Sequence, residues 1–147
     1  MPSSGIAILD EPVVCNALKQ AWQESQPGLA GGHEEGGFIL RNEAGRISVM
    51  RWPRGETDSI SMPPHADCRI RDKEIIGTFH THPNTGLDYL QEPGEADRRA
   101  VRDDPDLKGV GYVGELVISQ RAIYLITPNG DISEVAATRD ILSGEGG

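Results

Sequence analysis

Residues 74–83 read Glu74-Ile75-Ile76-Gly77-Thr78-Phe79-His80-Thr81-His82-Pro83, an apolar run that ends in two histidines and a proline. The run predicts a buried β-strand, in which residues two apart point to the same face. His80 and His82 should therefore project together, close enough to bind one metal ion. Because Pro83 lacks a backbone N–H and cannot continue a central strand, the pair should lie at a strand end, where functional sites are usually built.

The rest of the chain predicts an α/β domain that begins with a helix. Apolar residues recur at helical spacing from Val13 to Trp22, with Pro12 in the first turn and Asp10 placed to cap it. A second helix is expected over residues 94–101, because acidic residues come first and arginines follow, which complements the helix dipole. The expected strands cover residues 36–40, 47–50, 74–79, 116–118, 122–126 and 132–135. Together they predict a mostly antiparallel, mixed sheet flanked by helices, with residues 53–72 as a long surface loop.

Length and composition indicate one domain with an ordinary apolar core. The chain has 147 residues and a net charge of −9, which argues against binding to nucleic acid or to an anionic membrane. It contains no run of about 18 apolar residues and begins without the pattern of a signal peptide, so we expect a cytoplasmic protein. Cys15 and Cys68 are too few and too far apart for a zinc ribbon, and should be reduced thiols. Residues 143–147 are expected to be a flexible tail after a domain over residues 1–142.

A catalytic zinc site takes three protein ligands and keeps one position open. Asp97 is the best candidate for the third ligand, because it falls about one turn into the predicted second helix and can face back toward the strand end. Asp88 lies nearer to the histidines in sequence but in an irregular stretch. A general base is also needed. Glu34 is the candidate, with Glu35 as its rival, because two glycines follow and allow close backbone approach beneath the site.

Three motifs resemble, in order, the JAB/MPN domain and its JAMM metalloprotease branch. The family pattern is a Glu before a glycine-containing strand, then H-x-H-P, then P-S-x-x-D. The matching segments here are Glu34-Glu35-Gly36-Gly37-Phe38-Ile39-Leu40, His80-Thr81-His82-Pro83 and Pro93-Gly94-Glu95-Ala96-Asp97. The resemblance covers most of the chain and implies a single domain of the cytidine-deaminase-like fold.

The resemblance also implies a function and a role for each motif residue. It implies a deubiquitinase-like zinc isopeptidase or peptidase that hydrolyses the bond after a ubiquitin-like protein. His80, His82 and Asp97 would bind Zn²⁺, and Glu34 would assist the attack of the zinc-bound water. The implied partners are a ubiquitin-like protein or its conjugates, with the activating and conjugating enzymes of the same system as further partners.

Two features depart from the family pattern. The family serine, which helps to stabilise the tetrahedral intermediate, is Gly94 here, and loss of one such donor typically lowers a rate by about 10²–10³. The stretch from Pro83 to Asp97 is also longer than usual, and residues 87–90 could form a substrate-contacting flap. The glycine leaves a second interpretation open, in which a catalytically weak or inactive MPN-like module binds a ubiquitin-like protein or a scaffold partner.

Other interpretations of the histidines have weaker support. His80 and His82 could be structural residues at a strand end, and His33 and His65 are expected to be surface polar residues. A second site built from His65 and Cys68 has only a weak signal. A zinc nucleoside deaminase would need a paired-cysteine motif that the sequence lacks.

Overall fold

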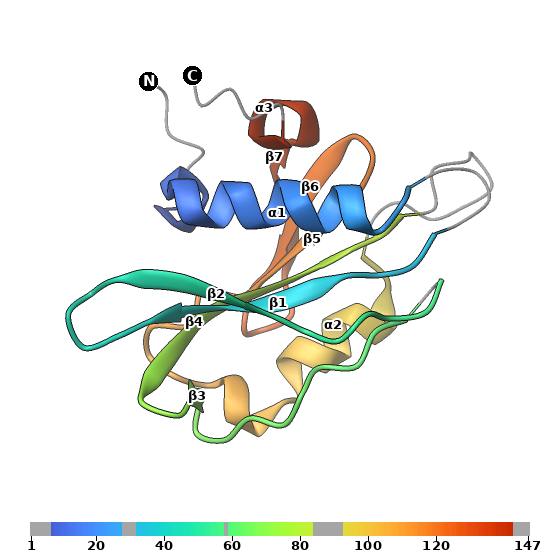
Figure 1. Cartoon of the computed structure of the whole chain (residues 1–147). Helices are drawn as coiled ribbons and strands as arrows, with labels where there is room; N and C mark the ends of the chain where they lie inside the picture. Colours follow the sequence, from blue (N-terminus) through green and yellow to red (C-terminus); the bar gives the residue numbers. More distant parts are fainter. Residues whose placement is uncertain (1–6, 28–31, 58, 84–92, 143–147) are drawn as a thin grey trace.

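The computed structural model describes residues 7–27, 32–57, 59–83 and 93–142, which form one twisted sheet with helices on both faces (Figure 1). Within these ranges the helical elements are η1 (Ala7–Asp10), α1 (Pro12–Glu24), α2 (Glu95–Arg102), η2 (Pro105–Leu107) and α3 (Thr138–Leu142), where η marks a 3₁₀ helix. The strands are β1 (Gly36–Arg41), β2 (Ile47–Arg51), β3 (Arg69–Ile70), β4 (Lys73–Thr81), β5 (Glu115–Ile118), β6 (Ala122–Ile126) and β7 (Ile132–Ala137). All six predicted strands and both predicted helices are therefore confirmed.

The sheet has the strand order β2-β1-β4-β5-β6-β7, and the short β3 pairs with β4 outside this path. Every pair is antiparallel except β4 and β5, which are parallel. The expected α/β class with a mostly antiparallel, mixed sheet is thus confirmed. Two parallel neighbours need a crossover connection, and the connection from β4 to β5 contains α2 and η2. This crossover brings α2 close to the end of β4, where the histidines lie.

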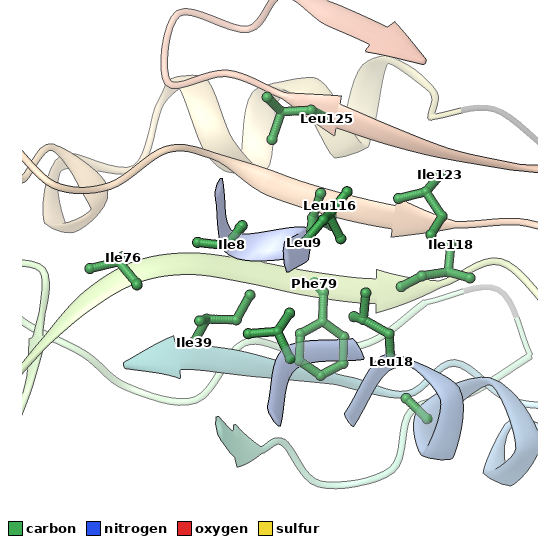
Figure 2. Close-up of a cluster of buried hydrophobic side chains, with 12 residues drawn as sticks. Ile8, Leu9, Leu18, Ile39, Ile76, Phe79, Leu116, Ile118, Ile123 and Leu125 are labelled. Carbon is green, nitrogen blue, oxygen red and sulfur yellow. The ribbon is translucent and has the colours of Figure 1, made fainter. Parts of the chain in front are cut away.

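Helix α1 covers one face of the sheet because its apolar residues share one side. Val14, Leu18 and Ala21 are fully buried, as the spacing of apolar residues predicts. They join inward-facing residues of four strands. Figure 2 shows Leu18 of α1 beside labelled residues of these strands. The strand members of this cluster are Ile39, Ile76, Phe79, Leu116, Ile118, Ile123 and Leu125. Figure 1 places α3 on the same side of the sheet as α1.

The opposite face carries a second core, and α2 lies over it (Figure 1). Its buried members are Phe38, Leu40, Trp52, Cys68, Ile75, Val101, Leu107, Tyr112, Val117 and Ile126. Alternation along β4 and β5 assigns Phe79 and Leu116 to the α1 face, and therefore His80 and Val117 to the α2 face. His80 therefore lies on the same face of the sheet as the second core.

Gly36 lies where β1 passes closest to its neighbours. A Cβ atom at Gly36 would lie 2.6 Å from the carbonyl oxygen of Phe79 and 2.5 Å from the ring of Trp52. The close backbone approach expected from the glycine pair is therefore present. We expect Gly36→Ala to lower the free energy of unfolding by about 1–3 kcal/mol, because the strand or the ring must move. Urea denaturation measures this change, and an unaltered midpoint would contradict the packing described.

The structure corrects some local expectations. Asp10 does not cap α1: it belongs to η1, and Glu11 is the N-cap, without a side-chain hydrogen bond. The predicted surface loop contains β3 and the buried residue Cys68. Helix α3 was not expected, because five residues give too short a periodic signal. Asp88, the proposed flap at residues 87–90 and the predicted tail at residues 143–147 lie outside the described residues.

Among the described helices, none combines the length and apolar character needed to span a lipid bilayer. Cys15 and Cys68 are both free thiols, as expected.

Candidate metal centre

His80, His82 and Asp97 converge at the end of β4. The Nε2 atoms of the two histidines lie 3.3 Å apart. Asp97 Oδ1 lies 3.2 Å from Nε2 of His80, and Asp97 Oδ2 lies 3.4 Å from Nε2 of His82. In the part of the chain that the structure describes, this is the one group of three or more His, Cys, Asp or Glu side chains whose ligand atoms all lie within 4.8 Å of one another.

The separation between the two histidine nitrogens matches what a tetrahedral metal site requires. Nitrogen and carboxylate ligands at 2.0–2.2 Å from a tetrahedral zinc lie about 3.3–3.6 Å from each other. The two Nε2 atoms lie 3.3 Å apart, within that range, and Asp97 presents a different carboxylate oxygen to each histidine, at 3.2 and 3.4 Å. His80 is buried, whereas His82 and Asp97 are partly exposed. The group could therefore hold one metal ion, and two of its three side chains remain partly exposed.

Asp97 owes its position to the start of α2. Gly94 is the N-cap of this helix, and its backbone N–H donates a hydrogen bond of 2.8 Å to Asp97 Oδ2. A carboxylate at the third helical position commonly reaches back in this way. The same side chain therefore completes the helix end and faces the two histidines, as the predicted helix register required.

His80 is held from behind by a buried carboxylate. Its Nδ1 atom is hydrogen-bonded to Glu115 Oε2, so its Nε2 atom faces Asp97 and His82. The other oxygen of Glu115 accepts a 3.0 Å hydrogen bond from Thr78, whose hydroxyl also lies 2.7 Å from that of Tyr112. All four side chains are buried.

The electrostatics of this group favour a positive charge. Burial lowers the pKa of His80, but the carboxylates of Glu115 and Asp97 outweigh it and hold that pKa well above its usual range. Burial raises the pKa of Asp97, but hydrogen bonds with His80 and His82 outweigh this effect and hold that pKa well below its usual range. The site therefore stabilises a cation, whether a proton or a metal ion.

The strand register predicts that Glu34 faces the same side of the sheet as the histidines. Gly36 pairs with His80, and the Thr81 N–H donates to the Glu35 carbonyl, so the antiparallel register continues and sets Glu34 opposite His82. Directly opposed residues share a face. Glu34 is buried, and its backbone is fixed by a 2.7 Å bond from its N–H to the carbonyl oxygen of Glu56.

Glu35, the rival candidate, is engaged on the other face. Its carboxylate accepts one hydrogen bond of 2.5 Å from Arg51 Nη2 and lies 2.5 Å from His33 Nε2. Arg51 also forms a 3.0 Å ion pair with Glu24 of α1. These contacts direct Glu35 toward α1, away from the metal centre. His33 was expected at the surface, but it is buried and its ring is paired with the Glu35 carboxylate.

The weaker second site has no matching geometry. His65 Nε2 lies 2.8 Å from Asp104 Oδ2, and its Nδ1 lies 2.8 Å from the Pro63 carbonyl oxygen. The sulfur of Cys68 is directed to the carbonyl oxygen of Ile75. Both histidine nitrogens are thus occupied by oxygen partners, and the side chain is only 10% exposed, which corrects the expected surface position.

Sequence reasoning missed Glu115. A charged residue at the head of the apolar run Leu116-Val117-Ile118 is a weak signal, because strands often begin with a polar residue. The contact of Glu115 with His80 depends on the parallel pairing of β5 with β4, which sets Glu115 beside Thr78.

Comparisons with protein-family models, with curated proteins and with solved structures found no match to this chain.

Proposed function

We propose that this chain is a zinc-dependent metallo-isopeptidase or peptidase of JAMM type, which hydrolyses the bond after a ubiquitin-like protein. The observation that supports it best is the convergence of His80, His82 and Asp97 on one point, with Glu34 on the same sheet face. The substrate class follows from the resemblance of the three motifs to the JAB/MPN family.

The donor set suits zinc. Two imidazole nitrogens and one carboxylate are typical ligands of catalytic zinc, and the partly exposed side of the group leaves room for water and substrate. A zinc ion held there would supply Lewis acidity and make a nearby water acidic enough to react near neutral pH.

Glu34 supplies the proton transfers. Its carboxylate removes a proton from the attacking water as the water oxygen bonds to the scissile carbonyl carbon. The same proton is then delivered to the nitrogen of the leaving lysine or α-amine as the C–N bond breaks. Glu34 is buried, and the bond from its N–H to the Glu56 carbonyl oxygen fixes the backbone from which the carboxylate would act.

The partners in this proposal are a ubiquitin-like protein or its conjugates, and the enzymes that activate and conjugate that protein. The cytoplasm is the proposed compartment.

A second candidate function is a binding module that holds a ubiquitin-like tail without cutting it. Gly94 favours this candidate, because the residue before the Glu95-Ala96-Asp97 turn lacks the hydroxyl of the family motif.

Metal analysis combined with a cleavage assay tests the proposal. We expect the purified protein to carry about one zinc per chain and to cleave a reporter fused behind the C-terminus of a ubiquitin-like protein. His82→Ala should lose both properties, because one ligand is removed. His65→Ala is the matched control, since that histidine contacts Asp104, and it should keep both. A wild-type protein that contains no zinc and cleaves none of a panel of fusions would contradict the proposal.

A further inference from the structure

Glu115 is a buried charged group that the proposed reaction does not use. Glu115 is the first residue of β5 and is 4% exposed. A buried carboxylate is costly unless it is paired and hydrogen-bonded. Its partners are His80 and Thr78, both from β4, so the cost of burying Glu115 is offset at the metal centre.

The parallel pairing of β4 and β5 explains how Glu115 reaches His80. Thr78 is the register partner of Glu115, and His80 lies two residues further along the same face. The carboxylate therefore lies behind the imidazole of His80, on the side away from Asp97. Since a carboxylate only accepts hydrogen bonds, His80 must carry a proton on Nδ1, and a neutral ring then presents its lone pair at Nε2.

Thr78 and Tyr112 extend this arrangement into the core. Thr78 donates to Glu115, and the two hydroxyls of Thr78 and Tyr112 lie 2.7 Å apart. Because Thr78 uses its proton toward Glu115, Tyr112 donates to Thr78. Tyr112 thus donates to Thr78, and Thr78 donates to Glu115. Glu115 also accepts from His80. Each donated proton in this chain has an acceptor.

We propose that Glu115 is a positioning residue that fixes the tautomer and orientation of His80 for metal binding, with Thr78 and Tyr112 holding the carboxylate in place. This inference rests on the proposed metal centre. The charges are consistent with it, because Asp97 and Glu115 together offset the two charges of a Zn²⁺ ion in a partly buried site. A carboxylate that accepts from the outer nitrogen of a histidine ligand typically contributes about 10–100-fold to metal affinity.

The test is metal affinity in the variant Glu115→Gln, measured by zinc competition against a chromophoric chelator. We expect zinc to bind about 10–100-fold more weakly than to the wild type. The absorption spectrum of the cobalt(II)-loaded variant should also change, because a neutral amide holds the His80 ring less firmly than a carboxylate does. The matched control is Glu74→Gln, which removes a carboxylate charge from the other end of β4, where Glu74 pairs with Arg41. The control should bind zinc and cobalt(II) as the wild type does.

Tyr112→Phe provides a milder variant if Glu115→Gln does not fold. It keeps the aromatic packing and removes one hydrogen bond to Thr78, so we expect zinc to bind about 2–10-fold more weakly. Tight zinc binding by the wild type with equal affinities in Glu115→Gln and Tyr112→Phe would overturn this inference alone. A wild-type protein that binds neither zinc nor cobalt(II) would overturn it together with the metal centre.

Discussion

Glu34→Gln is expected to lower kcat for cleavage of a ubiquitin-like fusion by about 10²–10⁴ while zinc content stays unchanged. The glutamine amide has nearly the same shape but cannot take a proton from water or return it to the leaving amine. None of the three proposed metal ligands is altered, so the site should still load. Single-turnover cleavage and metal analysis of the same sample measure both quantities.

Glu35→Gln is the matched control for this prediction. It makes the same chemical change one residue along the chain, on the face where Glu35 contacts Arg51 and His33. We expect a loss of stability, because two charge-assisted contacts are weakened, but not the loss of kcat seen with Glu34→Gln. A folded, zinc-loaded Glu34→Gln protein that cleaves at the wild-type rate would contradict the role of Glu34. Equal losses of kcat in the two variants would do the same.

The distinction between Glu34 and Glu35 shows what could be predicted from the sequence. Both carboxylates precede the same two glycines, so composition alone does not separate them. Strand alternation separates them once the pairing of Gly36 with His80 is known, because adjacent residues then face opposite sides of the sheet. The family motif favours Glu34 through its offset to Gly37, and the strand register, continued beyond Gly36, favours the same residue.

Local patterns were sufficient to predict the three side chains that converge at the candidate metal centre. His80 and His82 lie two apart on a predicted strand, and Asp97 was placed by a helix start that α2 confirms within one residue. Each of these inferences depends on periodicity over a few residues. Glu115 could not be predicted in this way, because its contact with His80 joins residues 35 positions apart through a parallel strand pair. Long-range pairing of this kind leaves no periodic signal in the sequence.

The sequence predicts surface positions for His33 and His65 for a related reason. A polar residue in a segment rich in glycine or proline is usually solvated, and nothing nearby in the sequence names a partner. The structure supplies a distant acid for His65, Asp104, and a buried pair for His33 with Glu35. Buried polar side chains are hydrogen-bonded as a rule, but the identity of the partner depends on the tertiary fold.

Gly94→Ser is expected to raise kcat by about 10²–10³, because it restores the hydroxyl that the family motif places beside the metal centre. Among the residues that the structure describes, a Cβ atom at Gly94 would meet only Asp97 Oδ2, at 4.0 Å, so they leave room for it. The backbone at Gly94 has φ −101°, which any residue adopts without strain. Serine is also a good N-cap, so stability should be equal or slightly higher. Steady-state cleavage of a ubiquitin-like fusion by the zinc-loaded proteins measures the change.

Gly94→Ala is the control that separates the hydroxyl from the added carbon. It places the same Cβ atom at the N-cap and should give no gain, because it offers no donor to the developing oxyanion. Cleavage by the wild type distinguishes the two candidate functions. A slow peptidase already cleaves as the wild type, and Gly94→Ser accelerates it. A binding module cleaves only as the Gly94→Ser variant. Equal rates for Gly94→Ser and Gly94→Ala would mean that the missing hydroxyl does not limit this site. The cause of any slow turnover would then lie in how the substrate carbonyl is positioned relative to Glu34 and the metal ligands.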